Sequence, residues 1–285
     1  MAFGGLIGSS TKVSAVEPFH RTGSPRLKTS LAAYSFRNQL QSSNPKEKID
    51  LFRFMDYCVE QDCDAAELTS YYFESTETEY LLRLKRHAFL LGLDISGTAV
   101  GNNFSLPLGS DRDKQISDVK AWIERAALLG APHIRIFAGP KGSLEFNEAK
   151  KLCVDGIQEC ADHAAQFGVF LGLENHGGIV ARAEDLVDIV QQVNSPWVGV
   201  NLDTGNFHTL DPYADLDICA PWAVNVQLKV EVRAQGSTSK ETDYARIACI
   251  LNKHKYQGYV ALEYESDTNP WESVPVYLEK MRKNF

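Results

Sequence analysis

The chain has 285 residues and a net charge of −8, with 44% hydrophobic and 23% charged residues. These fractions are ordinary for a globular protein and exclude a fully disordered, collagen-like or coiled-coil chain. An acidic chain repels phosphate backbones, and its densest basic run, Arg83–His87, is typical of an exposed helix face, so no nucleic-acid partner is expected. No stretch approaches the roughly 20 apolar residues that span a bilayer, so no membrane partner is expected either.

The first 27 residues differ from the rest of the chain. They open with apolar residues and glycines, pass through Val13-Ser14-Ala15, and then carry Pro18, Gly23, Ser24 and Pro25. We expect residues 1–27 to be a flexible segment that a protease can trim, and residues 28–285 to form a single domain. The segment resembles the second half of an export signal, but an ordinary tail fits equally well. The location of the protein therefore stays open between the cytoplasm and export in a folded state.

The six cysteines do not indicate a metal site or a disulfide framework. None forms a C-x-x-C pair, and a chain of this length does not need disulfide bonds to be stable. Most fall inside strand or helix patterns, where a thiol behaves as a small buried hydrophobic group. A zinc site made of cysteines is therefore disfavoured.

From residue 28 onward, short apolar runs alternate with longer amphipathic segments. Two of the helices are predicted over Asp118–Leu129 and over Asn147–Phe167, the second with Asn147 as its cap and Gly168 as its stop, and a last helix starts near Pro270. Eight strands are predicted: Thr29–Tyr34, Ala65–Thr69, Leu93–Thr98, His133–Phe137, Val169–Glu174, Val198–Asp203, Val224–Lys229 and Tyr259–Tyr264.

Eight strand–helix units predict an α/β fold with a parallel sheet, and eight is the number that closes a (β/α)8 TIM barrel. The alternative is an open, doubly wound sheet. That fold normally shows a glycine fingerprint after its first strand, where this chain has Ser35-Phe36-Arg37. The barrel is therefore the preferred fold.

Acidic residues stand at the ends of three predicted strands. Glu174 ends the fifth strand, Asp203 ends the sixth, and Glu263 is the last residue but one of the eighth. The carboxyl ends of barrel strands form the site in enzymes of this fold, and carboxylates gathered there repel one another unless they are paired or bind a cation. An oxygen-rich site of this kind suits Mn or Mg better than Zn or Co, so one divalent metal ion is the expected cofactor.

The motifs of the chain resemble those of the xylose-isomerase-like barrels, a family that includes sugar and sugar-phosphate isomerases and epimerases as well as the apurinic-site endonucleases of family 2. The resemblance covers residues 28–285. It rests on Tyr34-Ser35-Phe36, Leu171-Gly-Leu-Glu-Asn-His-Gly-Gly178, Val198-Gly-Val-Asn-Leu-Asp-Thr-Gly-Asn206 and Tyr259-Val-Ala-Leu-Glu263.

The resemblance implies that Glu174, Asp203 and Glu263 bind one metal ion. The fourth ligand in the family is a histidine on the seventh strand, where this chain has Gln227. We expect Gln227 to bind the ion through its amide oxygen; the alternative is that it only hydrogen-bonds a neighbouring carboxylate. Asn206 replaces a substrate-binding histidine of the family.

The expected activity is a sugar or sugar-phosphate isomerase or epimerase that moves a proton at the carbon next to a carbonyl. Glu174 and Glu263 are the predicted acid–base pair. The predicted substrate contacts are Arg135, His176, Asn206, Lys229 and Arg233, the last at a position where the epimerases have a substrate-binding arginine.

Two other functions stay open at this point. The chain could be a non-catalytic sugar-binding barrel that has lost its metal ion, because Gln227 stands in place of the histidine ligand. It could also be an apurinic-site endonuclease, although that chemistry uses several metal ions and many histidines, and this chain has seven histidines. For the isomerase or epimerase and for the sugar-binding barrel alike, the expected partner is a small carbohydrate. Assembly into a homo-oligomer is left open.

Overall fold

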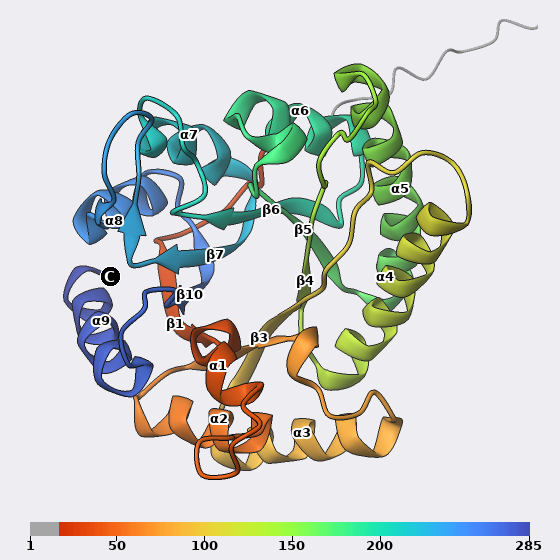
Figure 1. Ribbon diagram of the computed structural model, residues 1–285. Helices are drawn as coiled ribbons and strands as arrows, with labels where there is room; N and C mark the ends of the chain where they lie inside the picture. Colours follow the sequence, from red (N-terminus) through yellow and green to blue (C-terminus); the bar gives the residue numbers. More distant parts are fainter. Residues whose placement is uncertain (1–16) are drawn as a thin grey trace, which may run out of the picture.

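A computed structural model describes residues 17–285, which form one closed barrel of eight parallel strands surrounded by helices (Figure 1). Around the barrel the order is β1-β10-β7-β6-β5-β4-β3-β2. The barrel strands are β1 (Arg26–Ala32), β2 (Ala65–Thr69), β3 (Asp94–Ala99), β4 (His133–Ile136), β5 (Phe170–Glu174), β6 (Val198–Asp203), β7 (Ala223–Lys229) and β10 (Gln257–Glu263). The predicted (β/α)8 barrel is therefore confirmed.

The helices pack on the outside of this barrel. They are α1 (Arg37–Leu40), α2 (Leu51–Glu60), α3 (Thr78–Leu91), α4 (Ser110–Leu129), α5 (Phe146–Phe167), α6 (Ala183–Val193), α7 (Pro212–Cys219), α8 (Tyr244–Lys253) and α9 (Pro270–Asn284). After β7 the chain forms a small antiparallel pair, β8 (Glu231–Val232) with β9 (Lys240–Glu241), before it enters α8.

Helix ends follow the sequence signals in most places. Gly168 ends α5 in the left-handed conformation, as predicted, because a residue without a Cβ adopts a φ of 66° at little cost. The prediction that Asn147 caps this helix is wrong. The N-cap residue of α5 is Glu145, and its side chain makes no capping hydrogen bond. At α9 the cap is Asn269, whose side chain accepts from the backbone N–H of Trp271, followed by a proline at the first position.

The side chains of the barrel strands alternate between two environments. Leu173, Val226 and Leu228 point outward and are fully buried in the hydrophobic core between sheet and helices. The residues between them, such as Gln227, carry polar groups into the barrel interior, because successive side chains of a strand lie on opposite faces. Polar side chains therefore line the barrel interior, and apolar side chains pack between the sheet and the helices.

The segment before β1 packs on the end of the barrel opposite the strand C-termini. The backbone N–H of Phe19 donates to the carbonyl of Pro221, its ring lies 6.1 Å from that of Phe170, and Arg21 bonds the carbonyl of Ala223. Gln257 donates to the carbonyls of Thr22 and Ser24 at 2.7 and 2.9 Å. The packed structure thus begins upstream of the predicted boundary at residue 28. The proposed export-signal motif at Val13-Ser14-Ala15 lies outside the described residues.

The cysteines have the character expected from the sequence. Cys249 is exposed, all six are free thiols, and the other five are buried: Cys58, Cys63, Cys153, Cys160 and Cys219. Burial raises the pKa of the Cys153 thiol to about 12, so this thiol is inert at neutral pH. Within residues 17–285 no helix combines the length and the apolar composition that crossing a membrane requires.

Candidate active site

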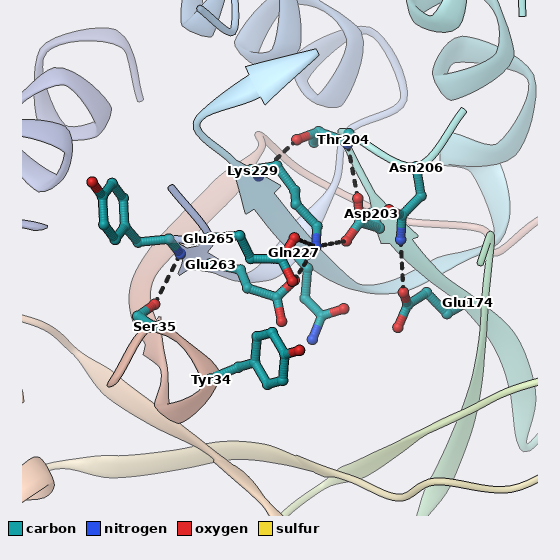
Figure 2. Close-up of polar contacts among 12 residues, drawn as sticks. Tyr34, Ser35, Glu174, Asp203, Thr204, Asn206, Gln227, Lys229, Glu263 and Glu265 are labelled. Carbon is teal, nitrogen blue, oxygen red and sulfur yellow. Dashed lines mark hydrogen bonds and ion pairs between the residues drawn. The ribbon is translucent and has the colours of Figure 1, made fainter. Parts of the chain in front are cut away.

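The three acidic residues predicted at the strand ends come together at the mouth of the barrel. Glu174 ends β5, Asp203 ends β6 and Glu263 ends β10, and all three are buried. With them lie two cations and one further carboxylate, and we refer to the six residues as the mouth cluster: Arg135, Glu174, Asp203, Lys229, Glu263 and Glu265. Figure 2 shows the other five members of the cluster, without Arg135, near one another at the barrel mouth.

Lys229 lies at the centre of the mouth cluster. Its Nζ is 3.0 Å from Glu263 Oε2 and 3.6 Å from Asp203 Oδ2, and it also pairs with Glu265 (Figure 2). The register of the sheet explains the contact, since Lys229 of β7 stands directly beside Glu263 of β10. Nearby carboxylates raise the pKa of Lys229 against the opposing effect of burial, so the ammonium form is the one present.

Glu174 is paired with the other cation of the cluster. Its Oε2 is 3.0 Å from Arg135 Nε, and its Oε1 accepts a hydrogen bond of 2.9 Å from Asn206 Nδ2. Arg135 is held in turn by the Phe137 ring, 3.8 Å below the guanidinium carbon, and by the carbonyl of Val100. Burial raises the pKa of Glu174 to about 7, although Arg135 opposes the shift, so this carboxylate can accept and release a proton near neutrality.

Asp203 is fixed by backbone contacts on two sides. Its Oδ1 accepts from the N–H of Gly205 at 2.8 Å, and the Asn175 side chain bonds both the N–H and the carbonyl of Asp203. Its Oδ2 is buried and makes no hydrogen bond, although Lys229 is nearby. Burial raises the pKa of Asp203 well above its usual range. This oxygen is therefore available to a substrate group.

Gln227 points below the mouth cluster, into a second polar layer. Its Nε2 donates to Glu67 Oε1 at 2.6 Å, and its Oε1 accepts from Asn201 Nδ2 at 2.7 Å. Asn225 Nδ2 donates to Glu67 Oε2 and to Asn201 Oδ1, both at 2.8 Å. We refer to these four residues, Glu67, Asn201, Asn225 and Gln227, as the inner layer. The amide of Gln227 is thus fully engaged within it.

Two cavities open at the barrel mouth, and the Lys229–Glu263–Glu265 group lies between them. The first has a volume of about 250 Å³ and is lined by Asn206, His208, Arg233 and the β8–β9 hairpin among others. The second, of about 230 Å³, contains Glu174 and has ring side chains in its wall: Tyr34, Tyr71, Phe137 and His176. We refer to them as the outer and the inner cavity.

The remaining predicted contact residues divide between these cavities. His176 is exposed and its ring centroid lies 4.4 Å from that of Phe137 in the inner cavity. Asn206 and the exposed Arg233 line the outer cavity, where His208 Nδ1 donates to the carbonyl of Arg233. Glu174 and Arg135 lie in the inner cavity, and Lys229 borders both.

Sequence reasoning missed the aromatic wall and the inner layer. Phe137 ends a predicted strand and Tyr71 comes two residues after another, so the strand-end rule that selected the carboxylates could have selected them. Glu67 lies inside β2 rather than at its end, so the same rule does not select it. Its amide partners Asn225 and Gln227 lie 158 and 160 residues away in sequence, and no local pattern points to them.

Cations of the chain itself stand where the sequence predicts a divalent ion. Among residues 17–285 no group of three or more histidine, cysteine or acidic side chains is placed to hold a metal ion. Lys229 stands against Asp203 and Glu263, and Arg135 against Glu174. The side chains as arranged do not fit a divalent ion. The ligand roles of Glu174, Asp203, Gln227 and Glu263, and the preference for Mn or Mg, stay predictions.

Comparison with known proteins gives the family. The model of the xylose isomerase-like TIM barrel family matches residues 55–283, so the chain belongs to this family and the resemblance seen in the sequence is confirmed. No curated protein matches the chain.

Solved structures share the fold at low identity. D-psicose 3-epimerase from Clostridium cellulolyticum H10, solved with D-tagatose, is 16% identical with a TM-score of 0.74, over 90% of this chain and 99% of that one. A 3-keto-D-glucoside 4-epimerase from E. coli is 15% identical with a TM-score of 0.73, over 90% and 100%. The IOLI protein, solved with a zinc atom, is 19% identical with a TM-score of 0.68, over 90% and 96%. These likenesses show the fold alone.

Proposed function

We propose that the chain is a carbohydrate isomerase or epimerase that moves a proton at the carbon next to a carbonyl group, with Glu174 and Glu263 as its acid–base pair. The observation that carries the proposal is that both carboxylates line one small cavity at the barrel mouth. They come from β5 and β10, which are separated around the barrel by β6 and β7. Two bases that face one cavity from different sides can serve two faces of one carbon, or two adjacent carbons.

The walls of the inner cavity suit a small sugar. Tyr34, Tyr71, Phe137 and His176 present ring faces and edges on which the C–H groups of a sugar can pack, while Glu174, Glu263 and Lys229 offer acceptors and donors to its hydroxyls. The volume of about 230 Å³ accommodates a single small sugar rather than a long oligosaccharide. Sugar epimerases among the solved structures of similar fold support this substrate class.

The proposed reaction has two proton steps. One glutamate takes the proton from the carbon next to the carbonyl, the C–H electron pair forms a C=C bond, and the carbonyl oxygen takes the negative charge. The other glutamate, which starts protonated, then gives its proton to the opposite face of the same carbon in an epimerase, and the C=O bond reforms. In an isomerase the adjacent carbon takes a proton instead, while the hydroxyl proton on the first carbon passes to the former carbonyl oxygen and the new C=O bond forms at the first carbon. The raised pKa of Glu174 favours this role, because an acid–base group is most effective when its pKa lies near the working pH.

The other residues of the mouth position these two carboxylates. Arg135 and Asn206 each hold one oxygen of Glu174, which leaves its remaining lone pairs to face the cavity. Arg233 and Asn206 are proposed to contact the far end of the substrate from the outer cavity. Glu231 and Glu265 line that cavity as well, so an uncharged sugar fits it better than a phosphorylated one.

A non-catalytic sugar-binding barrel is the second candidate, because each acid–base carboxylate is paired with a cation in the structure. The endonuclease alternative is disfavoured, because His176 and His208 are the histidines that line the mouth cavities while others, such as His133 and His254, lie elsewhere.

The decisive experiment is solvent exchange at carbon. The purified chain is incubated in D2O with a panel of free aldoses, ketoses and keto-glycosides, and each sugar is followed by proton NMR. Deuterium entering the carbon next to the carbonyl, together with a new epimer or isomer, is the expected result. Sugars that bind, by ligand-observed NMR, but never exchange their C–H protons would contradict the enzyme and support the binding barrel.

A further inference from the structure

The mouth cluster contains its own cation at the point where carboxylates converge. Lys229 Nζ contacts Glu263 and Glu265 and lies 3.6 Å from Asp203 Oδ2. The side chain of Lys229 is only 13% exposed, and those of Asp203 and Glu263 are 0% and 9% exposed. Three carboxyl groups thus converge on one ammonium, and two of them, those of Asp203 and Glu263, do so with little water around them, whereas the Glu265 side chain is 38% exposed.

The chain holds this lysine in place by several contacts. Its backbone N–H donates to Thr204 Oγ1 at 2.9 Å, and its carbonyl accepts from Thr242 Oγ1 at 2.6 Å. Gly205 makes room for its stem, since a Cβ at Gly205 would come within 2.8 Å of Lys229 Cβ. The ammonium therefore reaches the carboxylates from a fixed base rather than by a chance surface contact.

A divalent ion and this ammonium cannot share the same carboxylates. An ion bound by Asp203 and Glu263 would lie within a few ångströms of Nζ, and two cations at that distance repel strongly in a partly dry site. The neutral side chain of Gln227, at the position that the resemblance gives to a fourth ligand, is engaged instead with Glu67 and Asn201. The place between Asp203 and Glu263 is thus taken by a positive charge, and the fourth-ligand position offers a neutral amide that is already hydrogen-bonded.

We propose that Lys229 takes the place of the divalent ion, and that its ammonium group stabilises the negative oxygen formed during the reaction. The catalytic half of this inference rests on the proposed function. Lys229 borders both cavities, so Nζ can donate a hydrogen bond to the carbonyl oxygen of a sugar lying between them. As a glutamate removes the C–H proton and the C=C bond forms, the charge that develops on that oxygen is met by the ammonium; when the proton returns to carbon, the C=O bond reforms.

The proposed replacement of the divalent ion by Lys229 is tested without any substrate. The full chain is stripped with a chelator, and Mn²⁺, Mg²⁺, Zn²⁺ and Co²⁺ are each titrated by calorimetry into the parent and into Lys229→Met. The parent is expected to bind no stoichiometric ion, and Lys229→Met is expected to gain one site, because the carboxylates lose their counter-charge. Stoichiometric binding by the parent, or equal behaviour of parent and variant, overturns the inference.

Two controls separate charge from folding. Lys229→Arg keeps the positive charge and is expected to bind no ion, whereas Lys280→Met removes a surface lysine that pairs with Glu241 and is expected to behave as the parent. Circular dichroism and thermal unfolding establish that each variant is folded. Should Lys229→Met fail to fold, the titration of the parent and of Lys229→Arg still decides, because a bound ion in either one contradicts the inference.

The proposed role of Lys229 in the reaction is tested with the D2O exchange assay. We expect equal turnover in excess chelator and with added Mn²⁺. In Lys229→Met we expect turnover to fall by about 100-fold or more. Turnover that disappears with chelator and returns with metal overturns the inference while it supports the proposed function. A chain without turnover contradicts the proposed function instead, and the substrate-free titration then stands on its own.

Discussion

The mouth cluster and the inner layer lie one above the other in the same barrel, and they neutralise buried carboxylates in different ways. At the mouth, Glu174 and Glu263 face the charged groups of Arg135 and Lys229. In the inner layer, Glu67 accepts hydrogen bonds from the neutral amides of Gln227 and Asn225. The charged layer borders the two cavities, whereas Glu67 is fully buried.

This difference indicates that the mouth cluster and the inner layer have different roles. An ion pair at a cavity can exchange one partner for a substrate oxygen, so the mouth is suited to chemistry. A closed set of amide hydrogen bonds around one carboxyl group holds the strands together and fixes side-chain directions. Burial raises the pKa of Glu67 to about 7, so it carries a proton more readily than the usual glutamate.

The largest expected effect comes from removing one base at the mouth. Glu174→Gln and Glu263→Gln keep size and shape but cannot accept the proton, so turnover should fall by about 100-fold or more in each. Glu184→Gln, at an exposed position of α6, is the matched control and should leave turnover unchanged. Steady-state kinetics on the substrate found by exchange measures the effect. Near-parental turnover in both mouth variants would refute the acid–base assignment.

In the inner layer the corresponding change should alter stability and its pH dependence rather than chemistry. Because the folded-state pKa of Glu67 lies above the usual value, its protonated form favours folding at low pH, and this contribution is lost as pH rises through about 7. Glu67→Gln removes it. The difference in unfolding free energy between parent and variant should change by up to about 3 kcal/mol between pH 4 and pH 8, with the parent losing stability.

Urea denaturation at a series of pH values measures this difference. The Glu184→Gln variant, exposed to solvent, should give a curve parallel to that of the parent. Parallel curves for Glu67→Gln as well would mean that Glu67 titrates as an ordinary carboxyl group, and that the inner layer does not hold its proton.

A third prediction concerns the boundary between the two layers. On the sequence alone, Gln227→His should tighten zinc or cobalt binding. With Lys229 in place we expect little gain from Gln227→His by itself, and a gain of about tenfold or more when it is combined with Lys229→Met, because histidine adds a ligand and the competing charge is gone. Calorimetry with Zn²⁺ compares the two. Tight binding by the single variant would support the metal-ligand role predicted for Gln227.

The smallest expected effect lies at the opposite end of the barrel. Phe19→Ala removes the ring that packs on Phe170 and beneath Arg21, and should lower the unfolding free energy by about 1 kcal/mol. Phe89→Ala, at a residue that is 81% exposed on α3, is the control and should cost little. Equal stability of both variants in urea would favour the trimmable N-terminal segment predicted from the sequence over the packing of residues 17–25.

Much of the fold could be predicted because it depends on local patterns. Ala65–Thr69 and Val198–Asp203 were predicted with the bounds that the structure gives, since a short apolar run between turn residues is typical of a buried barrel strand. The first strand was less clear: it begins at Arg26 rather than Thr29, because its early residues are only partly buried and lack an apolar run. The position of the carboxylates at the mouth followed from strand ends alone.

The sequence by itself determined the barrel, the inward face of β7 and the gathering of Glu174, Asp203 and Glu263, because strand period and strand ends are local properties of the chain. Tertiary structure alone decided which partner each polar group meets. The register of β7 beside β10 sets Lys229 against Glu263, and closure of the barrel brings Glu67 of β2 to the amide of Gln227 on β7. Such pairings depend on the shear of the closed sheet, which no stretch of sequence encodes locally.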